Sequence, residues 1–345
     1  MRTFSLLMSF CFILHPLPAT TLGIGAPIVD VVIPVSFEEF EALKLEKGGS
    51  RWLTKEEFET ILRQIPAERR YMRPGGSCSN TIRGLACLKS PCAFIGMVGN
   101  DEAAHYLRQS MAELGIESRL LVSTADNTSH VISLVTPDGE RTMRCYPGAG
   151  TLMTGEDLQR HHFHNIKHLR MDGYDLYNPN LVQEALKQCK ALGITSSIDL
   201  SSYELVDKFQ EEIFRLLPQI HIVFANEDEA KALTGLGAEK ACEMMRQKCD
   251  VVVILMGEKG CWIGSQLGQF LSPTSPREAV DTTGAGDLFA SGFLYAYLNG
   301  ANLKTSAECG HVTGGTVVTV LGAEIPQNLW DDVRKEIALK THTVP

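Results

Sequence analysis

Short apolar runs alternate with amphipathic stretches through most of the chain, and this alternation limits the fold more than any other feature. Each run has the length of a buried strand, and each stretch between runs has the apolar spacing of a surface helix. This pattern predicts an α/β fold with three layers, in which helices cover both faces of a mainly parallel central sheet. Ligands of such a fold gather at the carboxyl ends of the strands. The predicted strands are residues 93–98, 194–200, 220–224 and 251–256, and the predicted helices include 102–114, 179–192 and 227–234.

Two segments break this rhythm, because they alternate apolar with polar residues as half-exposed antiparallel strands do. One runs through residues 31–52, and an amphipathic helix is predicted after it at 55–65. The other is residues 130–145, where VISLV and RTMRC flank a turn that contains Gly139. We expect a small β lid over the ligand edge of the main sheet, with lid segments at about residues 31–70 and 120–147.

The first residues imitate a secretory signal, because Arg2 is followed by an apolar run that is too short to span a bilayer. The apolar run from Leu22 to Ile33 follows without a polar spacer and is typical of a core strand. We therefore expect residues 1–21 to be an appendage outside the fold, with Met8 as an alternative start. Residues 22–340 are expected to form one domain, in a protein located in the cytoplasm.

Composition argues against several classes of partner. The 32 basic residues are outnumbered by 41 acidic ones and form no block that could follow a nucleic acid backbone. The ten cysteines include no C-x-x-C pair, which favours a reducing compartment without a disulfide framework. The histidine cluster lacks partners at metal-binding spacing, so we interpret it as a polar helix face. Its members are His161, His162, His164 and His168.

The segment from Asp281 to Asp287 (DTTGAGD) carries the most chemistry, and a helix that is apolar nearly all round follows it. Small residues at 284–286 allow a ligand to approach the backbone, and a helix start offers unpaired N–H groups to a phosphoryl oxygen. Asp287 would then accept a proton from an attacking hydroxyl. A tight turn with a carboxylate that favours the helix dipole explains the same residues equally well.

The full string resembles the signature of the ribokinase family, also called the PfkB family of carbohydrate kinases. The resemblance extends from about Gly23 to Pro326. It implies a ribokinase-like fold, with Asp287 as the catalytic base and Gly284, Ala285 and Gly286 as the anion hole. There is no P-loop and no protein-kinase signature, so phosphate binding would depend on this turn.

Other family landmarks follow in order along the chain. The string GGSCSN resembles the first family signature, in which Gly75, Gly76 and Asn80 bind the substrate. Residues 94–101 (FIGMVGND) resemble the strand and turn that come next. Asp30 matches the aspartate that accepts hydrogen bonds from two substrate hydroxyls.

The motif residues that would bind the nucleotide can each be explained by a purely structural role as well. Asn226 and Glu229 match the family motif N-x-x-E. The match implies that Asn226 binds phosphates and that Glu229 holds Mg²⁺ through water. The same spacing is also that of a helix capping box, which would be a purely structural role. Gly257 and Gly260 resemble a turn that contacts the nucleotide. Arg141 resembles a lid arginine directed at the phosphates, although a hairpin arginine is usually just solvated. Residues 309–322 resemble the helix beside the adenine pocket.

The resemblance implies an ATP-dependent kinase that transfers the γ-phosphoryl group to a hydroxymethyl group of a sugar or nucleoside. ATP and Mg²⁺ are the expected co-substrate and cofactor, a monovalent cation is left open, and we expect a monomer or homodimer without a membrane or nucleic acid partner. The long lid resembles that of adenosine kinases, but Ala26 stands where they commonly have asparagine, so simple sugars stay open. The alternative is a non-catalytic sugar or nucleoside sensor that retains the fold.

Overall fold

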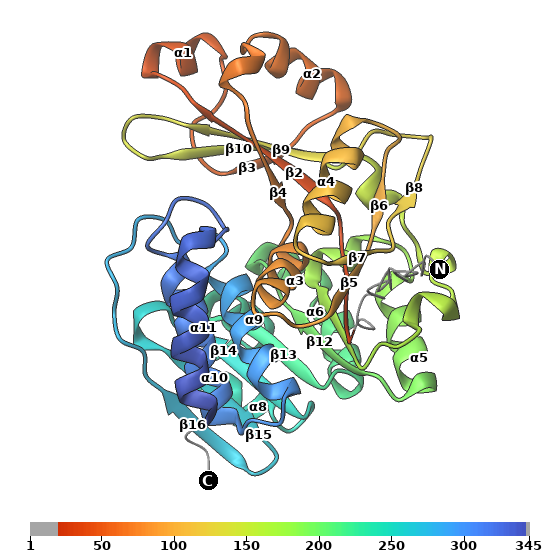
Figure 1. Ribbon diagram of the computed structural model, residues 1–345, viewed down its shortest axis with the longest axis vertical. Helices are drawn as coiled ribbons and strands as arrows, with labels where there is room; N and C mark the ends of the chain where they lie inside the picture. The colour runs from red at the N-terminus through yellow and green to blue at the C-terminus, as the bar shows by residue number, and fades with distance from the viewer. Residues whose placement is uncertain (1–19, 343–345) are drawn as a thin grey trace, which may run out of the picture.

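The computed structural model describes residues 20–342 and is built around a nine-stranded sheet (Figure 1). From β14 to β7 in the strand order all neighbours are parallel, whereas β15 and β16 are antiparallel at one edge. The order is β16-β15-β14-β13-β12-β11-β1-β5-β7. The strands are β1 (Thr21–Ile24), β5 (Cys92–Ile95), β7 (Glu117–Ser118), β11 (His168–Asp172), β12 (Thr195–Asp199), β13 (Ile222–Asn226), β14 (Val251–Leu255), β15 (Cys261–Ser265) and β16 (Gly268–Ser272).

Helices cover both faces of this sheet, which confirms the predicted three layers. Apolar side chains of one sheet face pack against α5 (Leu181–Leu192), α6 (Tyr203–Leu216), α7 (Glu227–Thr234) and α8 (Ala238–Met245). Those of the other face pack against α3 (Ser77–Cys87), α4 (Glu102–Glu113), α9 (Ala285–Leu298) and α10 (Leu303–Val317), and α11 (Gln327–His342) lies outside α10. No helix in residues 20–342 is long and apolar enough to cross a membrane.

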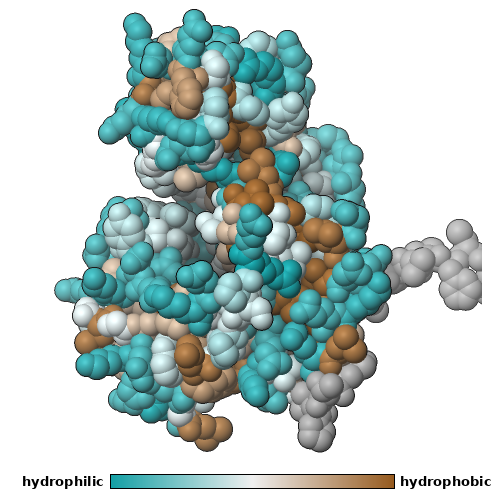
Figure 2. All heavy atoms as spheres, turned by 90° about the vertical axis from the view of Figure 1, so that its left-hand side faces the viewer, coloured by the Kyte–Doolittle hydropathy of each residue, from teal (hydrophilic) through white to brown (hydrophobic). Residues whose placement is uncertain are grey.

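A second sheet of five strands forms the lid above the body, and an indentation separates the two in the space-filling view (Figures 1 and 2). Val29, Val31 and Ile33 of β2 are buried on its outer face, under α1 (Phe37–Ala42) and α2 (Lys55–Arg63). Residues between them in sequence, such as Asp30, therefore lie on the inner face, toward the body. The lid order is β3 (Ser50–Trp52), β10 (Arg141–Tyr146), β9 (Ser129–Val135), β2 (Ile28–Pro34) and β4 (Tyr71–Gly75).

Two predicted strands are each split between sheets. The run 22–33 leaves the main sheet after β1 and joins the lid as β2, and the run 93–98 leaves it after β5 and continues as β6 (Met97–Val98), which pairs with β8 (Leu121–Val122). Both breaks occur where the two segments cross each other closely. A Cβ on Gly96 of one segment would lie 2.8 Å from the Pro27 ring of the other. Apolar patterning marks burial in either sheet and does not reveal such a crossing.

Three further expectations were wrong. Thr21 is buried in β1, so the fold includes the end of segment 1–21; residues 1–19 lie outside the described residues. The segment 31–52 contains α1 as well as strands. The histidines do not share a polar helix face, since His168 is buried in β11 and lies 2.8 Å from both the Thr195 and Ser197 hydroxyls.

Glycines let α9 approach its neighbours closely. A Cβ on Gly292 would lie 2.8 Å from the Cys309 carbonyl carbon in α10, and one on Gly84 of α3 would lie 2.7 Å from the Ser291 Cβ. Real Cβ atoms do not approach other atoms this closely, so larger residues at either position would push α9 away. The middle of α9 is thereby held against both α3 and α10.

Substitution Gly292→Ala tests this packing. In an open helix, Gly→Ala stabilises by about 0.5–1 kcal/mol. Here we expect the opposite sign, a loss of about 1–3 kcal/mol in urea unfolding, because the contact at 292 is backbone and cannot rotate away. Gly237→Ala is the control, since a Cβ there meets nothing within 4 Å. Equal stability changes in the two variants would contradict the proposed close packing.

Candidate active site

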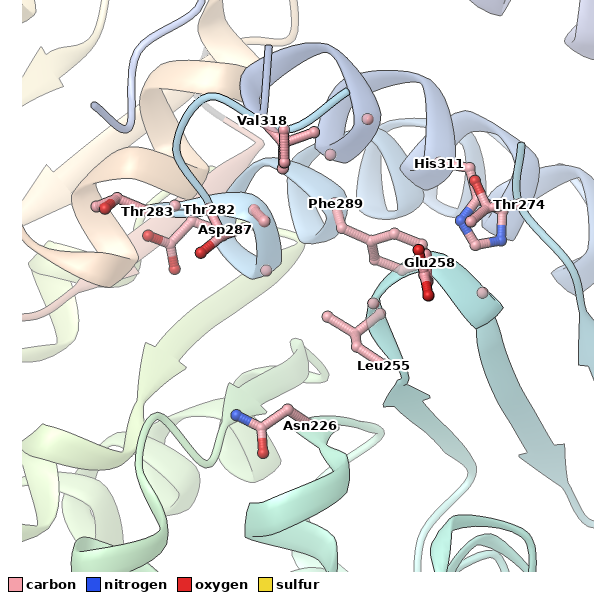
Figure 3. Close-up of a pocket in the computed structure, with 18 of the residues that line it drawn as sticks. Asn226, Leu255, Glu258, Thr274, Thr282, Thr283, Asp287, Phe289, His311 and Val318 are labelled. Carbon is pink, nitrogen blue, oxygen red and sulfur yellow. The ribbon is translucent and has the colours of Figure 1, made fainter. Parts of the chain in front are cut away.

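A cavity of about 790 Å³ lies along the carboxyl edge of the main sheet, where the strand pattern predicts ligands. Its floor includes the ends of β12, β13 and β14 at Asp199, Asn226 and Leu255. Asp287 lies at one end of the cavity, and His311 of α10 lies at the other (Figure 3). The opening is therefore long enough for an extended ligand with distinct ends.

The predicted anion hole forms the start of α9. Gly284 is the N-cap in the left-handed region, with φ 74°, and a Cβ there would lie 2.9 Å from the Ala323 Cα. The Ala285 N–H already donates to the Thr282 carbonyl at 3.2 Å. Within residues 20–342, the N–H groups of Gly286 and Asp287 have no acceptor. These two groups are the ones that the helix start offers to an anion.

Asp287 is held by two side chains from α3. The Ser77 hydroxyl donates to Oδ1 at 2.7 Å, and the Asn80 amide donates to Oδ2 at 3.0 Å. Burial raises the pKa of Asp287 to about 7, although the hydrogen bonds from Asn80 and Ser77 oppose this rise. The carboxyl group can therefore gain and lose a proton near neutral pH. Asn80 orients this carboxylate, a contact that the family motif did not predict.

Asp30 contacts the chain just before α3, whereas Asp287 contacts the first turn of α3. A Cβ on Gly75 would lie 2.5 Å from the Asp30 Cγ, so only glycine leaves room for the Asp30 carboxylate at this position. Gly76 has φ 95°, and a Cβ there would lie 2.7 Å from the Ala26 carbonyl oxygen. Asp30 touches Gly75 and Asp287 touches Ser77, two residues later. The two carboxylates therefore flank one short segment of backbone.

No hydrogen-bond donor in the described part of the chain reaches the Asp30 carboxylate. Burial raises its pKa to about 6, and the charge of Arg141 offsets this only in part. A part-buried carboxylate without donors is costly, and a ligand with hydroxyl groups would supply the missing hydrogen bonds. This is the environment expected of a substrate-binding aspartate.

The remaining predicted residues surround the cavity. Arg141 reaches down from the lid, donating to the Thr283 hydroxyl at 2.8 Å and pairing with Asp281 at 2.7 Å. Asn226 and Glu229 form a complete capping box at the cavity floor, in which the Asn226 amide donates to Oε1 at 2.8 Å. Gly257 and Gly260 also line the cavity, both with positive φ.

Two residues that sequence reasoning missed lie beside this group. Asp199 lines the cavity at the end of β12, and its Oδ2 accepts from the Arg170 guanidinium at 3.1 Å. Arg170 is fully buried in β11. Asp199 could have been found, because it ends a predicted strand at the edge where ligands gather. Arg170 carried no such signal, since the preceding residues gave no predicted strand.

Asp30→Asn is expected to stabilise the protein at pH 7. The folded pKa of about 6 exceeds the unfolded value of 3.8, so this group costs stability as pH rises from about 4 through 6. The stability gap between variant and wild type, measured by urea unfolding, should grow by about 1–3 kcal/mol over that interval. Asp207→Asn, on the exposed side of α6, is the control. A gap that stays constant with pH would show that Asp30 is not an unsatisfied charge.

Comparison with known proteins agrees with this geometry. Residues 54–330 match the pfkB family of carbohydrate kinases. Aminoimidazole riboside kinase of Salmonella typhimurium is 30% identical over 268 residues, which are 72% of this chain and 83% of that protein. A probable sugar kinase from Rhizobium etli has TM-score 0.82 and 27% identity over 92% of this chain and 98% of its own. Adenosine kinase from Sinorhizobium meliloti has TM-score 0.81 and 26% identity over 92% and 99%. Because the family match covers most of the chain and the solved structures share its fold, the chain belongs to the pfkB family of carbohydrate kinases and is a phosphotransferase that acts on an alcohol group.

Proposed function

We propose that the protein transfers the γ-phosphoryl group of ATP to a hydroxymethyl group, with Asp287 as the base. The proposal depends on the position of Asp287 between two possible ligand sites. Asp287 lines the cavity on one side, and on the other it lies close to Asp30 on the inner face of the lid. A triphosphate in the cavity would end at the free N–H groups of α9. An acceptor bound to Asp30 would approach the same point from the opposite side.

Phosphoryl transfer requires alignment and charge stabilisation more than covalent chemistry. Asp287 takes the hydroxyl proton as the new P–O bond forms, and ADP leaves with the electrons of the broken bond. The N–H groups of Gly286 and Asp287 stabilise charge on the transferred group. Arg141, now paired with Asp281, lies within reach of the same phosphate, and closure of the lid limits transfer to water.

Asp287→Asn should lower kcat by about 10² to 10⁴, the range of a positioned general base. The wild-type enzyme needs an ionised Asp287, so kcat/KM should rise with pH through about 7 and then level off. Coupled ADP release measures both quantities, and calorimetry checks that the variant still binds ATP. An unchanged kcat would remove Asp287 from the mechanism. A wild-type protein that binds adenosine and ATP without turnover would favour the sensor alternative.

Mg²⁺ belongs to this proposal as a partner of ATP. Both Glu229 carboxylate oxygens are engaged by Asn226, at 2.8 and 2.9 Å. Residues 20–342 contain no group of three or more His, Cys, Asp or Glu side chains that could hold a metal ion. These facts fit an ion held mainly by phosphate oxygens and water, which is how Mg²⁺ commonly binds. The ion would offset phosphate charge, and Glu229 would accept a hydrogen bond from one of its waters.

Glu229→Gln should raise the Mg²⁺ concentration needed for half-maximal activity several-fold and lower the melting temperature only modestly. Glutamine can still accept from the Asn226 backbone N–H of the capping box, but it loses the second bond, from the Asn226 side-chain amide. Titration of activity with Mg²⁺ at constant ATP measures the first effect, and calorimetry measures the second. Asp228→Asn, in the same helix turn but exposed, is the control. If both variants keep the wild-type Mg²⁺ requirement, capping is the whole role of Glu229.

A nucleoside is the acceptor that the lid favours. Trp52 pairs with Cys145, Cys145 with Val131 and Val131 with Asp30, so all four side chains lie in one row on the inner face. Three strand spacings of about 4.8 Å place Trp52 about 14 Å from Asp30, which is wider than one sugar ring.

An aromatic wall closes the far end of this row. Trp52 is 54% exposed and meets Tyr177 of η5 (Gly173–Tyr177) edge to face, with ring centroids 6.3 Å apart. Tyr174 of the same turn is 44% exposed and lines the cavity. Exposed aromatic rings at the edge of a cavity favour a flat apolar ligand group. A sugar at Asp30 that carries a heteroaromatic base would cover both features at once.

An ADP-release screen across adenosine, inosine, ribose, fructose and tagatose tests the acceptor class. We expect the nucleosides to have the highest kcat/KM. Trp52→Ala should lower that value about tenfold for nucleosides, because stacking on a base contributes about 1–3 kcal/mol, and should leave ribose unaffected. Leu267→Ala, which is fully exposed on the β15–β16 turn, is the control. A wild-type preference for free sugars would overturn the nucleoside assignment and leave the kinase assignment standing.

The cellular compartment and the oligomeric state are further proposals. ATP is abundant in the cytoplasm, and the nine cysteines in residues 20–342 are all free, which suits a reducing compartment. We place the enzyme there, as a monomer or homodimer. Mass measurement of the protein from fractionated cells would check the compartment.

A further inference from the structure

A buried ion pair lies beneath the proposed base. Arg170 is fully buried, donates to Asp199 at 3.1 Å, and has its guanidinium carbon 5.0 Å from the centre of the Phe224 ring. Its Nε and Nη1 atoms have no hydrogen-bond partner in the described part of the chain. Burying an arginine is costly in free energy, so its place in a central strand calls for a reason.

The pair lies against α9 and is connected through α3 to Asp287. Phe224, under the guanidinium, packs edge to face against Phe293 of α9, so Arg170 lies between the sheet and that helix. From α3, the Cys78 thiol donates to the Arg170 carbonyl oxygen at 3.3 Å, and the neighbouring Ser77 holds Asp287. Asp199 lines the same cavity as Asp287.

The surroundings of Asp287 are otherwise acidic. The titratable groups that interact with it are Arg170 from β11, Asp199 from β12, Glu229 from α7 and Cys78 from α3. Two more buried carboxyl groups, Asp172 of β11 and Asp175 of η5, interact with Arg170. Above it, Arg141 and Asp281 are already paired with one another. Arg170 is thus the buried cation that opposes several carboxylates. A bound triphosphate would add still more negative charge to this region.

The two members of the pair act on Asp287 in opposite directions. Asp199 raises the pKa of Asp287, whereas Arg170 lowers it. Arg170 also lowers the pKa of Asp172 and Asp175, whose carboxyls are buried. Neither residue donates to or accepts from Asp287 directly, so the influence acts through space.

We propose that Arg170 and Asp199 are positioning residues for phosphoryl transfer, an opposed pair of charges that sets the pH at which Asp287 becomes an effective base. The proposal rests on the proposed function, in which Asp287 accepts the hydroxyl proton. Arg170 keeps the base ionised despite its burial and the approaching phosphates. Asp199 moderates this effect, so that Asp287 retains enough basicity to take the proton.

The pH dependence of kcat/KM in single and double variants tests the pair. Arg170→Met removes the positive charge at similar length, and the pH midpoint of the rising limb should move up by about one unit. Asp199→Asn should move it down by about one unit. Arg170→Met combined with Asp199→Asn removes both charges, and its midpoint should return close to wild type. Asp207→Asn, exposed on α6, should not move it.

Opposite shifts with cancellation cannot come from loosened structure, which would lower activity at every pH or move both midpoints the same way. Midpoints that are unmoved, or that move together, would overturn the proposal. If Arg170→Met fails to fold because Asp199 loses its only cation partner in the described part of the chain, the downward shift in Asp199→Asn and the double variant decide the question. A wild-type profile with no rising limb, or an Asp287→Asn enzyme with full activity, would instead remove the proposed function itself.

Discussion

The contact between the start of α9 and the first turn of α3 is the interaction on which the proposed chemistry depends. Ser77 and Asn80 hold both oxygens of Asp287, and the Thr81 hydroxyl donates to the Asp287 carbonyl oxygen at 3.1 Å. Glycines at the α9 contacts permit this closeness. The proposed base is therefore fixed by two helices rather than by a loop, and within residues 20–342 the Gly286 and Asp287 N–H groups have no acceptor.

The lid belongs to the same arrangement, because its residues meet the body at several points around Asp287. Arg141 bonds to Thr283 and Trp52 meets Tyr177, while Asp30 lies against Gly75 at the end of β4, where the lid leads into α3. Each contact comes from the inner face of one twisted sheet. Movement of the lid would therefore change acceptor contact, phosphate contact and exclusion of water together. The cost of holding an unsatisfied carboxylate at Asp30 is the kind of local instability that binding sites carry.

The sequence predicted the layers, most strands and the lid, because apolar periodicity reports burial directly. It also singled out Asp287, Asp30 and Arg141 as candidate site residues, and the structure brings all three to the starts of α3 and α9. It did not predict that β1 and β2 belong to different sheets, since both are equally apolar. Nor did it predict the Asn80 contact with Asp287 or the burial of Arg170. Both features depend on contacts between side chains that are far apart in the sequence, and neither composition nor motif spacing predicts such contacts.

A crystal structure with a non-hydrolysable ATP analogue, Mg²⁺ and adenosine would show whether both ligands meet at Asp287. We expect the γ-phosphate at the N–H groups of Gly286 and Asp287, sugar hydroxyls on Asp30, and the nucleoside hydroxymethyl oxygen within about 3 Å of an Asp287 carboxylate oxygen. A triphosphate that ends elsewhere in the cavity, or a hydroxymethyl group that points away from Asp287, would contradict the proposed mechanism.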